Sequence, residues 1–69
     1  MKELKALIIS HIKGTSGLTS PMISELVKSK YKVLGSRDQR SIHAILNTYL
    51  ASPDEDEVRY ALFLKNTLS

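Results

Sequence analysis

Residues 36–50 have the sequence SRDQRSIHAILNTYL, and this stretch decides the fold class of the chain. Its apolar residues recur at helical spacing, at Ile42, Ile45, Leu46, Tyr49 and Leu50. Such a stripe predicts a helix that buries one side in a hydrophobic core. Gly35 breaks the chain before it, and Ser36 and Gln39 have the spacing of a capping box. We therefore predict a capped, amphipathic helix that begins at Ser36.

Two further helices are predicted upstream of this one. Residues 2–13 carry apolar side chains at helical spacing, and Gly14 follows where a helix end favours a left-handed residue. The second helix starts at Ser20 and Pro21, an N-cap followed by proline at the first helical position. Its predicted buried residues are Met22, Ile23, Leu26 and Val27. A short link with Tyr31, Val33 and Leu34 is expected to lead into the third helix.

The C-terminal segment supports two interpretations. As a strand, residues 58–65 place Val58, Tyr60, Leu62 and Leu64 on one face. Residues 53–57 then form the acidic tip of a wing. As a helix, they begin well at Ser52–Glu55, but Tyr60, Phe63 and Leu64 then form a second apolar stripe that needs its own cover. That stripe favours the strand. We expect residues 1–69 to form a single, mainly α domain, a three-helix helix-turn-helix core with a short C-terminal β wing; the alternative is a four-helix all-α fold.

Composition excludes several classes of protein. The 69 residues include no cysteine, which removes disulfide frameworks and thiolate metal sites. The longest apolar runs are far shorter than the roughly 20 residues that cross a bilayer. Residues 1–12 do not resemble a signal peptide, because polar residues interrupt their apolar positions. An intracellular protein is therefore expected, cytoplasmic or, in a eukaryote, nuclear, with no membrane association.

Catalytic and metal sites are not expected either. His11 and His43, the two histidines, lie on different predicted helices, with no carboxylate at ligand spacing. The acidic run Asp54–Glu57 lacks the alternating ligands and central glycine of a calcium loop. No serine belongs to a recognisable triad, and the glycines form no phosphate-binding motif. We expect no enzyme, no cofactor, no metal and no small-molecule substrate.

Positive charge is concentrated in the helical part of the chain. Residues 1–50 have a net charge of +5 and residues 51–69 a net charge of −2. A capped third helix with a basic N-terminal end has the features of a recognition helix for the DNA major groove. The candidate nucleic-acid-binding residues on and before that helix are Lys28, Lys30, Lys32, Ser36, Arg37, Arg40, Ser41, His43 and Asn47. DNA is therefore the expected partner.

A protein partner is the alternative hypothesis. The acidic turn at residues 53–57 is unlike the basic wings that bind DNA, and it lowers the expectation of wing contacts. Tyr60, Phe63 and Leu64 are surplus apolar residues that would suit a protein interface. The target sequence, the partner and the oligomeric state stay open at this level.

From Leu7 to about Phe63, the order of elements resembles winged-helix domains of the linker-histone type. The likeness lies in residues 16–19, in residues 31–33, and in Ser41, Ile42, Leu46 and Leu50. The resemblance implies a third helix in the major groove and a regulatory or chromatin-associated role. This sequence departs from the family at its wing, which there is longer, rich in glycine and basic.

Overall fold

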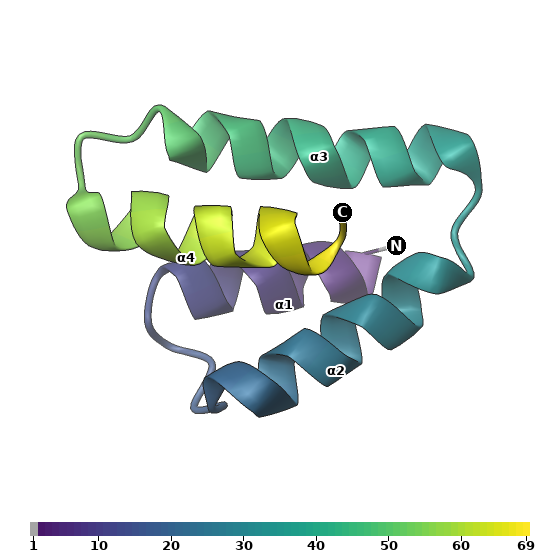
Figure 1. Cartoon of the computed structure of the whole chain (residues 1–69), viewed down its shortest axis with the longest axis horizontal. Coiled ribbons are helices and arrows are strands. Elements are labelled where there is room, and N and C mark those ends of the chain that lie inside the picture. Colours follow the sequence, from purple (N-terminus) through teal and green to yellow (C-terminus); the bar gives the residue numbers. More distant parts are fainter. Residues whose placement is uncertain (1) are drawn as a thin grey trace.

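Residues 2–69, the part of the chain that the computed structural model describes, form four helices joined by short connections. Their bounds are α1 Lys2–Ile12, α2 Ser20–Lys32, α3 Ser36–Leu50 and α4 Glu55–Thr67. Figure 1 shows α3 along one edge, α4 beside it, α1 behind α4, and α2 crossing obliquely at the opposite edge. None of these helices has both the length and the apolar character to cross a membrane.

All four helices contribute to one hydrophobic core. Its fully or almost fully buried members are Leu4, Ile8, Ile12, Ile23, Val27, Ile42, Leu46, Ala61 and Leu64. On each of α1, α2 and α3 these residues repeat every three or four positions, so each helix turns one side inward. The strongest contact between helices is the one between α3 and α4, and α4 also packs against α1 and α2.

The prediction of a C-terminal β wing is wrong. Residues 2–69 contain no strand, and the four-helix all-α alternative fits. Residues 53–57 are not a wing tip, because Asp54 is the N-cap of α4 and its side chain accepts a hydrogen bond from the backbone N–H of Asp56. The second apolar stripe does have a cover, since α4 contacts all three other helices and therefore buries a wide apolar face.

An ion pair ties the start of α4 to the end of α1. Lys13 Nζ lies 2.8 Å from Glu57 Oε2, and Ser52 Oγ donates to the other carboxylate oxygen at 2.7 Å. The hydrogen bond from Lys13 is the main reason that the pKa of Glu57 is lowered and that of Lys13 is raised. The acidic run is thus a helix start with a structural contact.

The predicted helix ends are partly confirmed. Gly14 is left-handed, with φ 78°, two residues after the end of α1. Thr19, rather than Ser20, is the N-cap of α2, and its side chain accepts from the N–H of Met22. The predicted capping box at Ser36 is wrong: Gly35 is the N-cap of α3, with no side-chain cap, and Gln39 Nε2 donates to the carbonyl of Tyr31. Tyr31 itself belongs to α2 rather than to the link.

Candidate nucleic-acid interface

The candidate interface centres on the side of α3 that faces away from the core. We call this the α3 outer face, defined as Arg37, Arg40, Ser41, Ala44 and Asn47. Ser41 is half-buried, and the other four side chains are exposed. Ile42 and Leu46, on the opposite side of the helix, are completely buried. The helix therefore lies at the surface with its polar side open, along the upper edge of the molecule in Figure 1.

Arg37 and Arg40 are free of ion pairs. The pairs found within residues 2–69 are Lys13–Glu57, Lys30–Glu3 and Arg59–Asp56. Asp38 is the only acidic residue of α3, and it lies about 100° around the helix from Arg37. The α3 outer face thus carries two uncompensated positive charges and no carboxylate.

The first turn of α3 adds partial positive charge. Because Gly35 offers no side-chain acceptor, the first backbone N–H groups of α3 have no cap from a side chain. Ser36 is exposed in this turn. Uncapped N–H groups and the helix dipole together favour anions near Arg37 and Arg40.

His43 and Asn47 have partners inside the molecule. His43 Nε2 shares a 2.7 Å hydrogen bond with Tyr31 Oη, and the two rings meet edge to face with centroids 5.6 Å apart. This contact joins α3 to α2. Asn47 Oδ1 accepts from Lys65 Nζ of α4 at 2.7 Å. The two residues were predicted to contact nucleic acid, but their ring nitrogen and amide oxygen already take part in contacts between helices.

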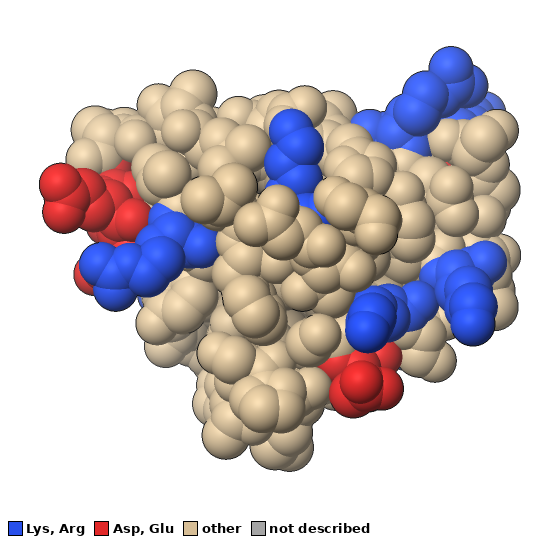
Figure 2. Space-filling model, in the orientation of Figure 1, with Lys and Arg blue, Asp and Glu red and all other residues tan. Residues whose placement is uncertain are grey.

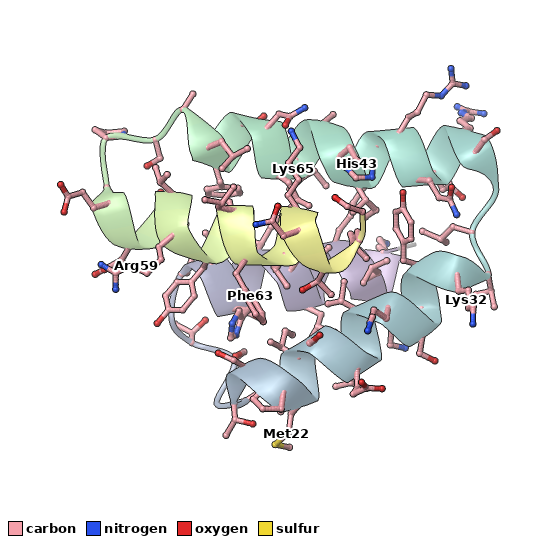
Figure 3. The ribbon with its side chains drawn as sticks, viewed as in Figure 1. Met22, Lys32, His43, Arg59, Phe63 and Lys65 are labelled. Carbon is pink, nitrogen blue, oxygen red and sulfur yellow. The ribbon has the colours of Figure 1, made fainter. Side chains whose placement is uncertain are left out.

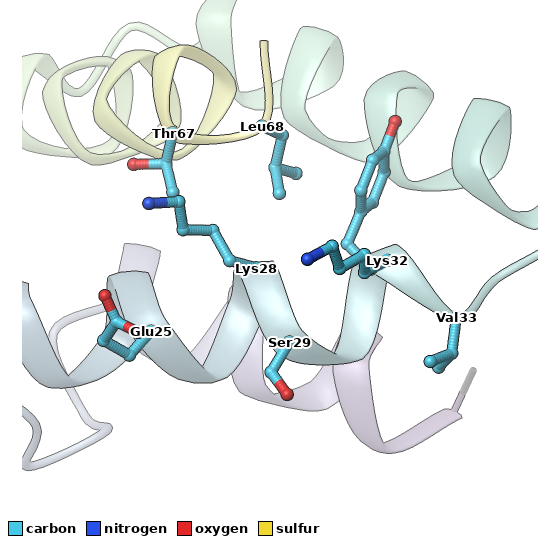
Figure 4. A pocket seen from close by; sticks show the side chains of 8 residues that line it. Glu25, Lys28, Ser29, Lys32, Val33, Thr67 and Leu68 are labelled. Atoms are coloured by element: carbon cyan, nitrogen blue, oxygen red, sulfur yellow. The ribbon is translucent and has the colours of Figure 1, made fainter.

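The three lysines of α2 separate into two groups. Lys30 lies 3.7 Å from Glu3 of α1. Lys28 and Lys32 line a groove of about 570 Å³ between α2 and the end of α4, together with Thr67 and Leu68 (Figure 4). Figure 2 shows Lys and Arg side chains above and below the right-hand end of the view, where α2 turns into α3. Lys28 and Lys32 therefore open into the groove between α2 and α4, whereas Lys30 is turned toward α1.

The residues of the alternative protein interface belong largely to the core. Leu64 is fully buried, and Tyr60 and Phe63 are half-buried against it. Tyr60 meets the His11 ring edge to face, with centroids 5.1 Å apart. These three residues do not form an exposed patch.

Sequence reasoning missed two features. Met22 and Leu26 were expected in the core, but they are 51% and 40% exposed. Ile23 and Val27 fill the core side of α2 instead, and the spacing of Met22 and Leu26 relative to Val33 marks a separate stripe. The second feature is His11, which is buried. Its spacing was a signal, because His11 follows Leu4 by seven positions and Ile8 by three, on the stripe that faces the core.

Comparisons with models of protein families, with curated proteins and with solved structures gave no match for this chain. The resemblance to winged-helix domains therefore stays a prediction from sequence, and residues 2–69 contain no strand that could form the wing it implied.

Proposed function

We propose that this domain binds duplex DNA, with the α3 outer face in the major groove. The observation that carries the proposal is a surface helix whose open side has two unpaired arginines and no carboxylate. Arginine is suited to both phosphate oxygens and guanine edges, because its planar guanidinium donates several hydrogen bonds in a fixed geometry.

The size of the side chains supports the same proposal. Beyond the arginines, the α3 outer face continues with Ser41 and Ala44, and the exposed residues Thr48 and Ala51 follow on the same side. Small side chains allow the backbone of a helix to approach base edges, and a helix about 10–12 Å wide fits a major groove about 12 Å wide. Residues 33–35 join α2 to α3 in a short turn that contains Gly35, although these two helices have little direct contact with each other.

The remaining basic residues have supporting roles in the proposal. Lys28 and Lys32 provide contacts to phosphates beside the groove that α3 enters, and the first turn of α3 holds one further phosphate. Such contacts are independent of sequence and sensitive to salt. Asn47 and His43 are assigned no base contact, since each already bonds a neighbouring helix.

The first test is titration of a fluorescent duplex DNA with the full chain at several salt concentrations. Binding should weaken by about 0.9 log units per log unit of salt for each phosphate neutralised. Replacing either Arg37 or Arg40 by Gln should weaken binding and reduce that slope. The matched control is Arg59→Gln, because Arg59 is equally charged but sits on α4 in a pair with Asp56. No binding at low salt, or an equal loss in the control, would reject the proposal.

A second test places a carboxylate on the α3 outer face without touching the core. Ala44→Glu should abolish binding through repulsion from phosphate, and glutamate preserves the helix. Ala6→Glu is the matched control, because Ala6 is an exposed helical alanine on α1 and the change in net charge is the same. Equal weakening by both variants would mean that only total charge matters, and it would contradict recognition through α3.

A further inference from the structure

A stripe of exposed apolar side chains runs along the outside of α2. Met22, Leu26 and Val33 are 51%, 40% and 83% exposed, and Ser29 lies between them on the same side. We call these four residues the α2 seam. Met22 points away from the other helices at the lower edge of Figure 3. Ile23 and Val27, on the core side of α2, are completely buried, whereas the exposed parts of the seam are left uncovered by residues 2–69.

The spacing of the α2 seam is that of a helix-pairing surface. Positions 22, 26, 29 and 33 follow one another at intervals of four, three and four residues, the repeat by which one helix packs lengthwise on another. Ser29, near the middle, is small enough to let two backbones approach. Methionine adapts its shape to the surface that it meets. The seam is therefore built to receive a second helix.

Charges beside the α2 seam indicate which helix this is. Glu25 and Lys32 directly precede seam residues Leu26 and Val33, so both lie on the same flank, one heptad apart. Neither belongs to the ion pairs found within residues 2–69. Both also line the groove drawn in Figure 4. On the other flank, Lys30 already pairs with Glu3.

We propose that the α2 seam binds the α2 seam of a second copy of this chain, with the two helices antiparallel. A twofold axis perpendicular to the helices reverses their direction but leaves each flank on its own side. Glu25 of each copy then faces Lys32 of the other, so the same ion pair forms twice, once at each end of the interface. This self-complementarity is what an isologous interface requires. The seam lies at the edge of the molecule opposite the α3 outer face (Figure 1), so pairing leaves Arg37 and Arg40 open, whereas Lys32 then bonds Glu25 of the other copy in place of a phosphate.

The test is sedimentation equilibrium of the full chain without DNA, over concentrations from the low micromolar to the millimolar range. The expected result is an average mass that rises from monomer toward dimer. Met22→Gln and Leu26→Gln should each shift the transition to higher concentration. Leu62→Gln should not, although Leu62 is 48% exposed on α4 and makes a matched control. A monomer at every concentration, or an equal shift in the control, would overturn the proposal, and a different partner would then have to cover the seam.

Charge reversal tests the antiparallel orientation of the two helices. The double variant separates this effect from any general effect on folding. Glu25→Lys and Lys32→Glu should each weaken the dimer about tenfold, because each variant converts two attractive surface pairs into repulsive ones. The double variant E25K/K32E restores the pairs in reverse and should recover most of the affinity. Circular dichroism of all three variants confirms that the helices are retained. A double variant as weak as the single ones would exclude the antiparallel pairing.

Discussion

His11 is the one buried polar side chain in the core of residues 2–69, at 5% exposure. Its Nδ1 shares a 3.0 Å hydrogen bond with Ser16 Oγ, which also accepts from the N–H of Leu18 and so organises the connection between α1 and α2. Its Nε2 is buried without a partner. Burial lowers the pKa of His11, because it removes water from the charged form of the ring. A charged imidazole would also need an acceptor at each of its two nitrogens.

We expect the lowered pKa of His11 to make stability fall in mild acid. Above the ordinary histidine pKa of about 6.5, the ring is neutral in both the folded and the unfolded chain. Below it, the unfolded chain binds a proton that the folded protein resists, so the free energy of unfolding decreases until the folded pKa is passed. Urea unfolding at pH values from about 7.5 to about 5 measures this decrease.

The matched variant for this prediction is His11→Leu, which removes the titrating group and keeps an apolar side chain in the same place. Its free energy of unfolding should depend less on pH than that of the original protein. Other titrating groups are common to both proteins and cancel in the comparison. An unchanged slope in the variant would mean that His11 does not sense pH.

At the scale of the element, α4 shows how an ambiguous segment is resolved. A strand over residues 58–65 would place Val58, Tyr60, Leu62 and Leu64 on one face, but a single pair of strands is only marginally stable without further cover. As a helix, the same residues bury Ala61 and Leu64 completely and pack Tyr60, Phe63 and Leu68 against the core. Contact with three helices makes the helix the more stable choice.

Two leucines of α4 provide a test of this arrangement. Leu64 is completely buried and Leu62 is 48% exposed. Leu64→Ala should lower the free energy of unfolding by about 2–5 kcal/mol, since it leaves a cavity in the shared core. Leu62→Ala should change it by no more than about 0.5 kcal/mol. Denaturant unfolding compares the two variants. Similar losses would be incompatible with the observed orientation of α4, whereas a strand that placed both leucines on one face would predict them.

At the scale of the whole molecule, a single core is shared by four helices. A chain of 69 residues buries only about 60% of its unfolded surface, so little stability is held in reserve. Because α4 packs against α1, α2 and α3, it is an essential part of the core. The fold should therefore be cooperative, with no three-helix subdomain that is stable alone.

Removal of α4 tests this cooperativity. A fragment ending at Ser52 retains all of α1, α2 and α3. We expect it to lose most of its helical circular dichroism, because Ile8, Val27 and Leu46 would lose the buried side chains that α4 contributes. A fragment that still unfolded cooperatively would show that the first three helices form an independent core.

Much of the fold follows from residue patterns. The stripes of α1 and α3 predict helices that the structure contains, and Gly14 marks the end of α1 as expected. The arginines predicted on the open side of α3 are exposed. Tertiary packing decided the details that were predicted wrongly. His43 and Asn47 form hydrogen bonds with Tyr31 and Lys65, which are distant in sequence. On α2, Ile23 and Val27 fill the core, whereas Met22 and Leu26 are exposed.

The sequence alone determined three helices, the outward orientation of Arg37 and Arg40, and the asymmetry of charge between residues 1–50 and 51–69. These properties depend on periodicity and local chemistry, which nearby residues specify. Only the tertiary structure decided that residues 55–67 form a helix, that Asn47 is bonded to Lys65 and that the α2 seam is open. Each of those outcomes depends on which surfaces meet, and burial against distant elements outweighs the small differences in local propensity.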